Sequence, residues 1–180
     1  MKNASPKVAN FISNIYTDEA DDTYSSLITD IPSKMMGNLS ITDVDIFSKL
    51  SKLKVEKSPG PDFVHPRVIF EIRTEITSAL KMLFQLSLES GKLPIDWTKS
   101  IISMIHKKGS KTDVANYRPI SLTCICCKVL ESLIRDHIVE FCLANNLFSA
   151  KQFGFIKGRS TVLQLLNVVD EWSDSLECGG

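Results

Sequence analysis

Two stretches of the chain concentrate positive charge in a way that suits phosphate binding. From Lys99 to Arg118 there are five basic residues and one acidic residue, and from Lys151 to Arg159 there are three basic residues and no acid. The formal net charge of the 180 residues is zero, so these stretches together carry +7 and the rest carries −7. If the fold brings both stretches together, they form a cationic surface for a nucleotide or nucleic acid. The alternative is two separate solvated loops.

The cysteines and histidines do not form a convincing catalytic or metal-binding pattern. The side chains that could suggest zinc are Cys124, Cys126, Cys127 and His137. They have no second ligand pair at zinc spacing, and the cysteines fall on the apolar pattern of a helix, so buried thiols are favoured. His65 and His106 have no nucleophile at a useful spacing, and we interpret both as structural. We therefore expect no catalytic residue, no metal ligand and no bound cofactor in this chain.

Composition indicates an ordinary globular protein. Apolar residues make up 43% of the chain and charged residues 23%, which favours neither disorder nor a fibrous repeat. The five cysteines are odd in number and three are crowded together, so we expect reduced thiols and an intracellular location, with nucleus and cytoplasm both open. No signal peptide or membrane-spanning stretch is predicted, and we expect no membrane partner.

The elements that must position the basic stretches are mainly helices. A helix is predicted from Asp43 to Lys52, capped by Thr42, with Val44, Phe47 and Leu50 on its apolar face. After a loop at Ser58–Asp62, one long helix is predicted from Pro66 to Ser90, ended by Gly91. Its predicted apolar face comprises Ile69, Ile72, Ile76, Leu80, Leu83 and Leu86.

The first basic stretch is predicted to form two short strands and the second to lie between two helices. Strands are expected at 100–106 and 117–122, with Pro119 suited to an edge because proline cannot donate to the ladder. Amphipathic helices are expected at 123–143 and from Thr161, where Thr161 and Gln164 could make a capping box. The last helix should bury Val162, Leu165, Leu166, Val169, Trp172 and Leu176. The predicted fold class is α+β, mainly helical, with a short β-hairpin.

Four segments in order carry a resemblance to a known family. They are KSPGPD at Lys57–Asp62, LPIDWTKSIISMIHKKG at Leu93–Gly109, NYRPISL at Asn116–Leu122 and QFGFIKGRST at Gln152–Thr161. Together they resemble the RNA-directed DNA polymerase (reverse transcriptase) of non-LTR, LINE-type retrotransposons, the jockey-like group most of all. The resemblance covers about residues 41–177.

The resemblance implies the N-terminal extension and fingers of a right-hand polymerase, with the palm missing. The expected domains are a poorly determined segment at 1–41, a helical extension at 42–97 and a fingers portion at 98–180 that stops before the palm. The family pattern implies that the nucleotide-binding residues, which face the triphosphate, are Lys107, Lys108 and Arg118. Pro119 would restrict Arg118 to an extended backbone and so aim its side chain.

The template-binding residues implied by the same resemblance are Gly154, Lys157, Gly158 and Arg159. Their glycines would let the backbone approach phosphate or base closely, and their cations would supply charge. The family commonly has an arginine where this chain has Ile156, which removes one expected cation. Phe153 and Phe155 are favoured as core residues over base-stacking platforms.

Catalysis in this family needs two magnesium ions held by palm aspartates, and neither aspartate motif is found in the chain. Glu19–Asp22 imitates one motif in letters but precedes the fingers and is interpreted as a solvated acidic run. The 180 residues alone are therefore expected to be inactive, with Mg²⁺ used by the complete polymerase. The implied partners are an RNA template, DNA, deoxynucleoside triphosphate, and the missing palm and thumb. The alternatives are a non-catalytic nucleic-acid-binding module and a non-functional transposon remnant.

Overall fold

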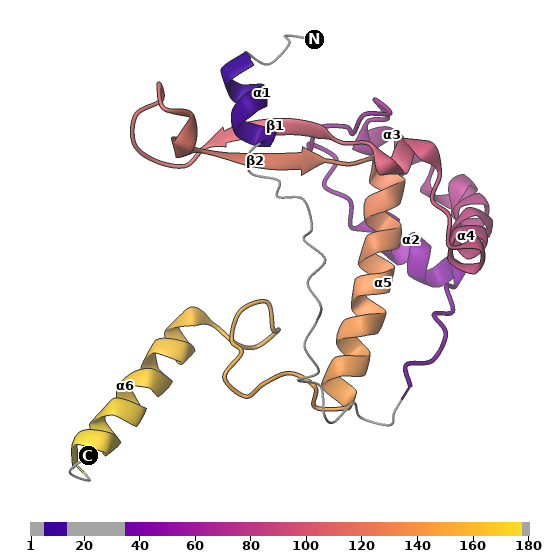
Figure 1. Ribbon diagram of the computed structural model, residues 1–180. Coiled ribbons are helices and arrows are strands. Elements are labelled where there is room, and N and C mark those ends of the chain that lie inside the picture. Colours follow the sequence, from indigo (N-terminus) through magenta and orange to yellow (C-terminus); the bar gives the residue numbers. More distant parts are fainter. Residues whose placement is uncertain (1–5, 14–34, 178–180) are drawn as a thin grey trace. The chain divides into compact units, whose positions relative to one another are not determined.

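The computed structural model describes residues 6–13 and 35–177 (Figure 1). The described elements, in chain order, are α1 (Pro6–Ser13), α2 (Asp43–Ser51), α3 (Pro66–Glu71), α4 (Arg73–Ser90), the 3-10 turn η1 (Ile95–Thr98), β1 (Ile101–His106), the 3-10 turn η2 (Val114–Asn116), β2 (Tyr117–Leu122), α5 (Ile125–Ala144) and α6 (Thr161–Glu177). The chain forms two compact units, residues 1–135 and 136–180. The predicted mixture of many helices and one two-stranded hairpin is confirmed.

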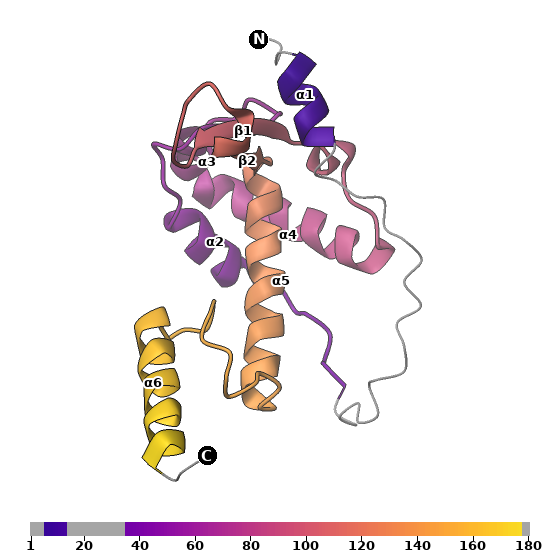
Figure 2. The same ribbon diagram turned by 60° about the vertical axis from the view of Figure 1, so that its left-hand side comes forward.

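The core of the first unit is formed by apolar side chains from α2, α3, α4 and α5. Figures 1 and 2 both show α2 and α4 beside the first turns of α5. Ile46 and Leu50 of α2 and Phe84 of α4 are fully buried. They meet Val129, Leu130 and Leu133 of α5 in one cluster. Complete burial of one such side chain stabilises a fold by about 2 kcal/mol, so this cluster holds the three helices together.

Helix α2 begins where the sequence predicts, but its buried face is different. Thr42 accepts a hydrogen bond from the Asp45 amide, and the Asp45 carboxylate accepts one from the Thr42 amide, which completes a capping box. The predicted core residues Val44 and Phe47 are 76% and 40% exposed. The third predicted core residue, Leu50, is fully buried together with Ile46, and the Asp43 carboxylate pairs with Lys81 of α4 at 2.7 Å.

The predicted single helix at 66–90 is two helices. The chain leaves helical geometry at Ile72, whose φ and ψ are −93° and 18°, so α3 ends at Glu71 and α4 begins at Arg73. Of the predicted core residues, Ile69 and Leu80 are buried and Ile76 packs against the core, whereas Ile72, Leu83 and Leu86 are exposed. The face that α4 buries is formed by Thr77, Leu80, Phe84 and Ser87. The stop at Gly91 is confirmed by its left-handed φ of 64°.

Strands β1 and β2 pair antiparallel, as predicted, with Ile101 opposite Leu122 and His106 opposite Tyr117. The Lys107 amide donates to the Asn116 carbonyl at 2.8 Å, one position beyond the assigned strands. Because hydrogen-bonded and non-hydrogen-bonded pairs alternate in such a ladder, the Met104–Pro119 pair falls at a non-hydrogen-bonded position. Pro119 therefore costs the hairpin no hydrogen bond.

The loop at Ser58–Asp62 packs against the point where β2 passes into α5. Gly60 is buried, and a Cβ added to it would lie 2.6 Å from the Cys124 Cα and from the Thr123 carbonyl oxygen. No side chain fits there without moving backbone. Glycine was predicted at this site for a chain reversal, whereas the structure requires it for a close approach.

In the second unit, α5 ends near Asn145–Asn146, as predicted, and Asn146 adopts a left-handed φ of 53°. The predicted capping box at Thr161 is wrong, because Ser160 accepts the hydrogen bond from the Leu163 amide and precedes the helix. No residue of α6 is buried, and the apolar residues predicted to be buried are 53–83% exposed. Within the described part of this unit, no apolar surface covers them.

None of the described helices is long and apolar enough to cross a membrane.

Candidate nucleic-acid interface

The hairpin carries its cations at the end that is remote from α5. Arg118 lies opposite Ile105 in the ladder, so both side chains are on one face of the hairpin. Side chains alternate along a strand, and the ladder continues through the Lys107–Asn116 hydrogen bond. Lys107 therefore lies on the same face as Arg118, as its diagonal neighbour. Lys108 follows at the start of the connecting loop.

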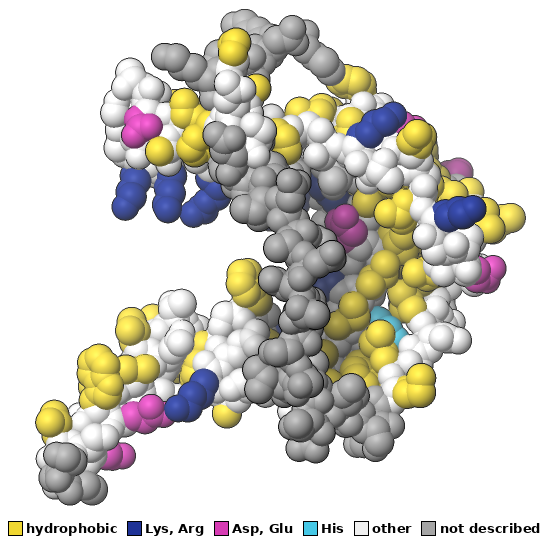
Figure 3. All heavy atoms as spheres, viewed as in Figure 1, with side chains coloured by type: hydrophobic (Ala, Val, Ile, Leu, Met, Phe, Trp, Pro, Cys, Tyr) yellow, Lys and Arg dark blue, Asp and Glu magenta, His cyan; other side chains and the backbone are white. Residues whose placement is uncertain are grey.

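These cations are exposed, and their charged groups have no partner among the residues that the structure describes. Figure 3 shows Lys and Arg side chains projecting side by side from the loop end of the hairpin. Across residues 6–13 and 35–177, no side chain forms a hydrogen bond or ion pair with the charged groups of Lys107, Lys108 or Arg118. The Lys81–Asp43 and Lys99–Asp96 ion pairs, by contrast, join lysines of the same unit to carboxylates. The hairpin end thus offers free positive charge to an anion.

The loop between the strands is organised by its own hydrogen bonds. The His106 Nε2 lies 3.1 Å from the Gly109 carbonyl oxygen, and the His106 ring meets the Tyr117 ring edge to face at 5.3 Å. The Tyr117 hydroxyl donates to the Lys111 carbonyl at 3.0 Å, and the side-chain Nδ2 of Asn116 donates to the Ser110 carbonyl at 3.0 Å. These contacts fix the backbone from which Lys107 and Lys108 project.

Sequence reasoning missed the roles of Asn116 and Tyr117, although a signal was present. His106 and Tyr117 end and begin the two predicted strands, so an aromatic pair across the first step of the turn could have been inferred. His106 was interpreted as structural, and its contacts lie within the hairpin and its loop. His65 was interpreted in the same way, and its Nδ1 accepts from the Arg67 amide at the start of α3.

Arg159 of the second basic stretch points into its own loop. Its Nη1 donates to the carbonyl oxygens of Ser149 at 3.0 Å and Ala150 at 3.2 Å, and also to that of Gln152. Its guanidinium lies 5.6 Å from the centre of the Phe153 ring. The arginine therefore holds the loop before α6 together. A template contact by Arg159 stays a prediction.

The other predicted template residues lie on the surface of this loop. Lys157 is exposed, Gly158 adopts a φ of 82°, and a Cβ on Gly154 would meet nothing within 4 Å. Phe153 is half-buried, whereas Phe155 is fully exposed with a left-handed φ of 64°. The expectation of a core position is therefore wrong for Phe155, because the loop reverses at that residue and turns its ring outward.

The structure brings together Lys107, Lys108 and Arg118 in the first unit, and Gly154, Lys157, Gly158 and Arg159 in the second. A meeting of the two basic stretches stays a prediction.

The crowded cysteines belong to the core at the start of α5. Cys124 and Cys127 are buried, and burial raises the pKa of all three thiols, that of Cys126 to about 11. For Cys127, burial and then a hydrogen bond to the Glu131 carboxylate raise the pKa to about 12. Protonated thiols are poor metal ligands and poor nucleophiles. Among the described residues, no three His, Cys, Asp or Glu side chains form a group that could hold a metal ion.

The chain is similar in sequence to polymerases of mobile elements. It is 31% identical over 139 residues to the RNA-directed DNA polymerase from mobile element jockey of Drosophila melanogaster. This match covers 77% of this chain and 15% of that protein. It is 35% identical over 116 residues to the probable RNA-directed DNA polymerase from transposon X-element of the same fly, covering 64% of this chain and 13% of that one.

A third relative is the probable RNA-directed DNA polymerase from transposon BS of Drosophila melanogaster, with 30% identity over 153 residues. This match covers 83% of the chain and 16% of the relative. No protein-family profile matches the chain. The chain thus spans about one seventh of the length of these curated relatives, at 13–16%.

Proposed function

We propose that this chain, which is 30–35% identical in its matched residues to RNA-directed DNA polymerases of Drosophila mobile elements, uses its hairpin end to bind the phosphates of nucleic acid or of an incoming nucleotide. One observation carries the proposal. Lys107, Lys108 and Arg118 are exposed on one end of the hairpin, and among the described residues their charged groups have no partner. Unpaired cations on a fixed backbone are suited to a polyanion.

Arginine and lysine side chains bind phosphate in different ways. Arg118 is a planar fork that can donate two parallel hydrogen bonds to one phosphate, and its extended backbone before Pro119 limits the directions it can take. Lys107 and Lys108 are compact charges on flexible stems and would neutralise neighbouring phosphate oxygens. In this proposal the chain is the fingers part of a polymerase, with the palm and thumb contributed by the rest of a longer protein.

The polymerisation step itself is not assigned to these residues. Nucleotidyl transfer needs divalent cations held by carboxylates, and no described group of side chains fits a metal ion. We propose that the described residues bind and orient phosphates, and that any metal-dependent chemistry belongs to segments of the relatives outside the matched region.

The test is the salt dependence of RNA binding. Lys107→Ala, Lys108→Ala and Arg118→Ala are combined in the full chain, and binding to a single-stranded oligoribonucleotide is followed by fluorescence anisotropy between low and high salt. Loss of three phosphate contacts should reduce the slope of log K against log salt by about 2 and weaken binding about 100-fold at about 0.1 M salt.

The matched control removes three exposed lysines from separate segments of the same unit: Lys54 after α2, Lys92 after α4 and Lys128 in α5. It changes net charge equally, so only a local phosphate site distinguishes the two variants. The proposal fails if both triple variants lose the same affinity and the same salt slope.

A further inference from the structure

The second unit contains a pocket between the loop at 150–153 and one side of α6. Its volume is about 380 Å³, within the range of about 300–1,000 Å³ typical of small-molecule sites. Its lining residues are Ala150, Lys151, Phe153, Gln164, Asn167, Val168 and Glu171. Phe153 and Val168 are half-buried and the other five are exposed, so the pocket has an apolar base and a polar, open rim.

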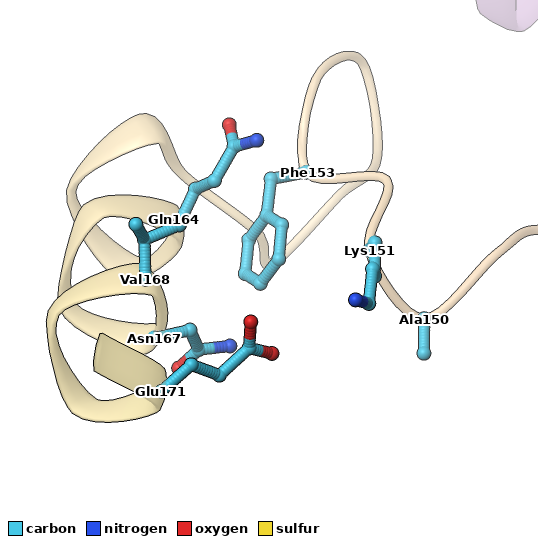
Figure 4. A pocket seen from close by; sticks show the side chains of 7 residues that line it. All are labelled: Ala150, Lys151, Phe153, Gln164, Asn167, Val168 and Glu171. Carbon is cyan, nitrogen blue, oxygen red and sulfur yellow. The ribbon is translucent and has the colours of Figure 1, made fainter. Parts of the chain in front are cut away.

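Two opposite charges face this pocket without neutralising each other. Figure 4 shows the Lys151 ammonium and the Glu171 carboxylate directed into the same space, one from the loop and the other from α6. Within the part of the chain that the structure describes, neither forms an ion pair. A hydrogen-bond donor and a hydrogen-bond acceptor are therefore held apart, with room for a ligand between them.

The Phe153 ring lies in the same space, between the lysine and the helix (Figure 4). Its position is fixed, because the Arg159 guanidinium lies 5.6 Å from the ring centre and is itself bonded to three loop carbonyls. A fixed aromatic ring beside polar groups suits a flat heterocycle, which can stack on the ring and use its edge for hydrogen bonds.

We propose that this pocket binds an unpaired guanine base of single-stranded nucleic acid. Guanine presents two adjacent donors, N1–H and the 2-amino group, and the acceptor O6 on the same edge. A carboxylate can accept both donors in parallel, and an ammonium can donate to O6. Glu171 and Lys151 supply these two partners, with the amide of Asn167 beside Glu171.

The other bases match the pair less well. Adenine and cytosine offer one amino group beside an acceptor, and uracil offers one N–H between two acceptors, so none presents two adjacent donors to Glu171. The proposal concerns a base and the second unit, whereas the proposed function concerns phosphates and the hairpin. The two can therefore fail separately.

The experiment uses nucleosides, which have no phosphate and so do not test the hairpin. Guanosine, inosine and adenosine are titrated into the isotope-labelled full chain, and amide shifts are followed by NMR. Guanosine should shift the signals of Lys151, Phe153 and Glu171. It should bind about tenfold more tightly than inosine, which lacks only the 2-amino group.

Glu171→Gln should weaken guanosine binding about tenfold and abolish the difference between guanosine and inosine. Asp170→Asn is the matched control, since Asp170 is an exposed carboxylate on the same helix that does not line the pocket. Both substitutions are at exposed positions, so both variants should fold. Equal affinity for guanosine and adenosine, or equal loss in the two variants, overturns the proposal.

A final arm tests whether the base must be unpaired. A single-stranded oligoribonucleotide with one guanine should bind more weakly to Glu171→Gln than to Asp170→Asn, whereas a duplex of the same sequence should bind both alike, because pairing occupies the guanine edge. A duplex whose affinity depends on Glu171 contradicts the proposal.

Discussion

The hairpin end and the loop before α6 are both basic in sequence, but they use their arginines in different ways. Arg118 leaves the hairpin with its guanidinium exposed and, among the described residues, without a partner. Arg159 folds back and donates to the carbonyl oxygens of Ser149, Ala150 and Gln152. Arg118 exposes its charge to solvent, whereas Arg159 uses its hydrogen-bond donors on the surrounding backbone.

The difference comes from the local backbone. A strand directs its carbonyl groups along the ladder, so a strand arginine finds no carbonyl cluster near its side chain. A loop that curls on itself gathers carbonyl groups that have no ladder partner, and a guanidinium with five donors can satisfy several at once. The charge of a segment therefore predicts ligand binding only where the backbone does not already use the cation.

The largest effect is expected from the support of the hairpin. Gly60→Ala should lower the free energy of unfolding of the first unit by about 3 kcal/mol, because its Cβ would lie 2.6 Å from the backbone of Cys124. Urea denaturation measures this loss, and hydrogen exchange locates it at the junction of β2 and α5. Gly37→Ala is the control, since a Cβ there meets nothing within 4 Å. Equal stability of the two variants would show that the backbone at the junction moves to accept a side chain at little cost in free energy.

The next effect separates the two arginines. Arg159→Ala should destabilise the loop at 149–159 by about 2 kcal/mol, because it leaves loop carbonyls without their charged donor. Amide hydrogen exchange in that loop should accelerate accordingly. Arg118→Ala should leave exchange in the hairpin unchanged, since that guanidinium donates to no described group. Similar acceleration in both variants would remove the distinction between the arginines.

A smaller effect is expected in the turn that carries Lys107 and Lys108. Gly109 has a φ of 79°, and a Cβ there would lie 2.7 Å from the Asn116 side chain. Gly109→Ala should cost about 1 kcal/mol and weaken RNA binding severalfold by displacing the turn. Gly154→Ala, where φ is ordinary and space is open, should change neither quantity. Unchanged RNA binding by the Gly109 variant would show that the turn does not position the cations.

The last effect concerns the reactivity of single thiols along α5 and leaves stability and RNA binding unchanged. The pKa of Cys127 is raised to about 12, so at pH 8 its thiolate is about 1,000-fold scarcer than that of a thiol with the ordinary value of 9.0, and its alkylation should be slower. Alkylation at pH 8 with mass mapping should therefore modify half-buried Cys142 of the second unit before Cys127. Modification of Cys127 first would contradict a closed core at this end of α5.

The same thiol links stability to alkaline pH. A raised pKa means that the folded state keeps its proton more tightly than the unfolded state, whose thiol titrates near 9.0. The contribution of Cys127 is fully present below pH 9 and is lost as pH rises toward about 12. The free energy of unfolding should thus fall over this window, and less steeply in Cys127→Ala.

Sequence patterns predicted the elements well where local signals are strong. The strand at 117–122 has the predicted bounds, because alternation, Pro119 and the preceding polar turn all agree. The start of α2 follows from Thr42, and the end of α4 from Gly91. These signals depend on residues only a few positions apart, so they can be recognised without knowledge of the tertiary fold.

Sequence patterns failed where a contact between distant residues determines which side chain is buried or where a helix breaks. The break at Ile72 follows no proline or glycine, and Phe84 rather than Leu83 faces the core because it meets Trp97 at 5.7 Å. At the site, the three cations of the hairpin could be named from sequence, but the contacts of Arg159 could not. Its carbonyl acceptors become neighbours only when the loop closes.

The fit of Gly60 against Cys124 also bears on the order in which the protein folds. Residues far apart in the chain must meet backbone to backbone there, and closing so long a stretch is slow compared with forming a helix. An isolated two-stranded ribbon is barely stable in water. The β1–β2 hairpin that carries the cations should therefore become stable only after Gly60 has met Cys124. The candidate site should thus form late in folding, although its own contacts are local in sequence.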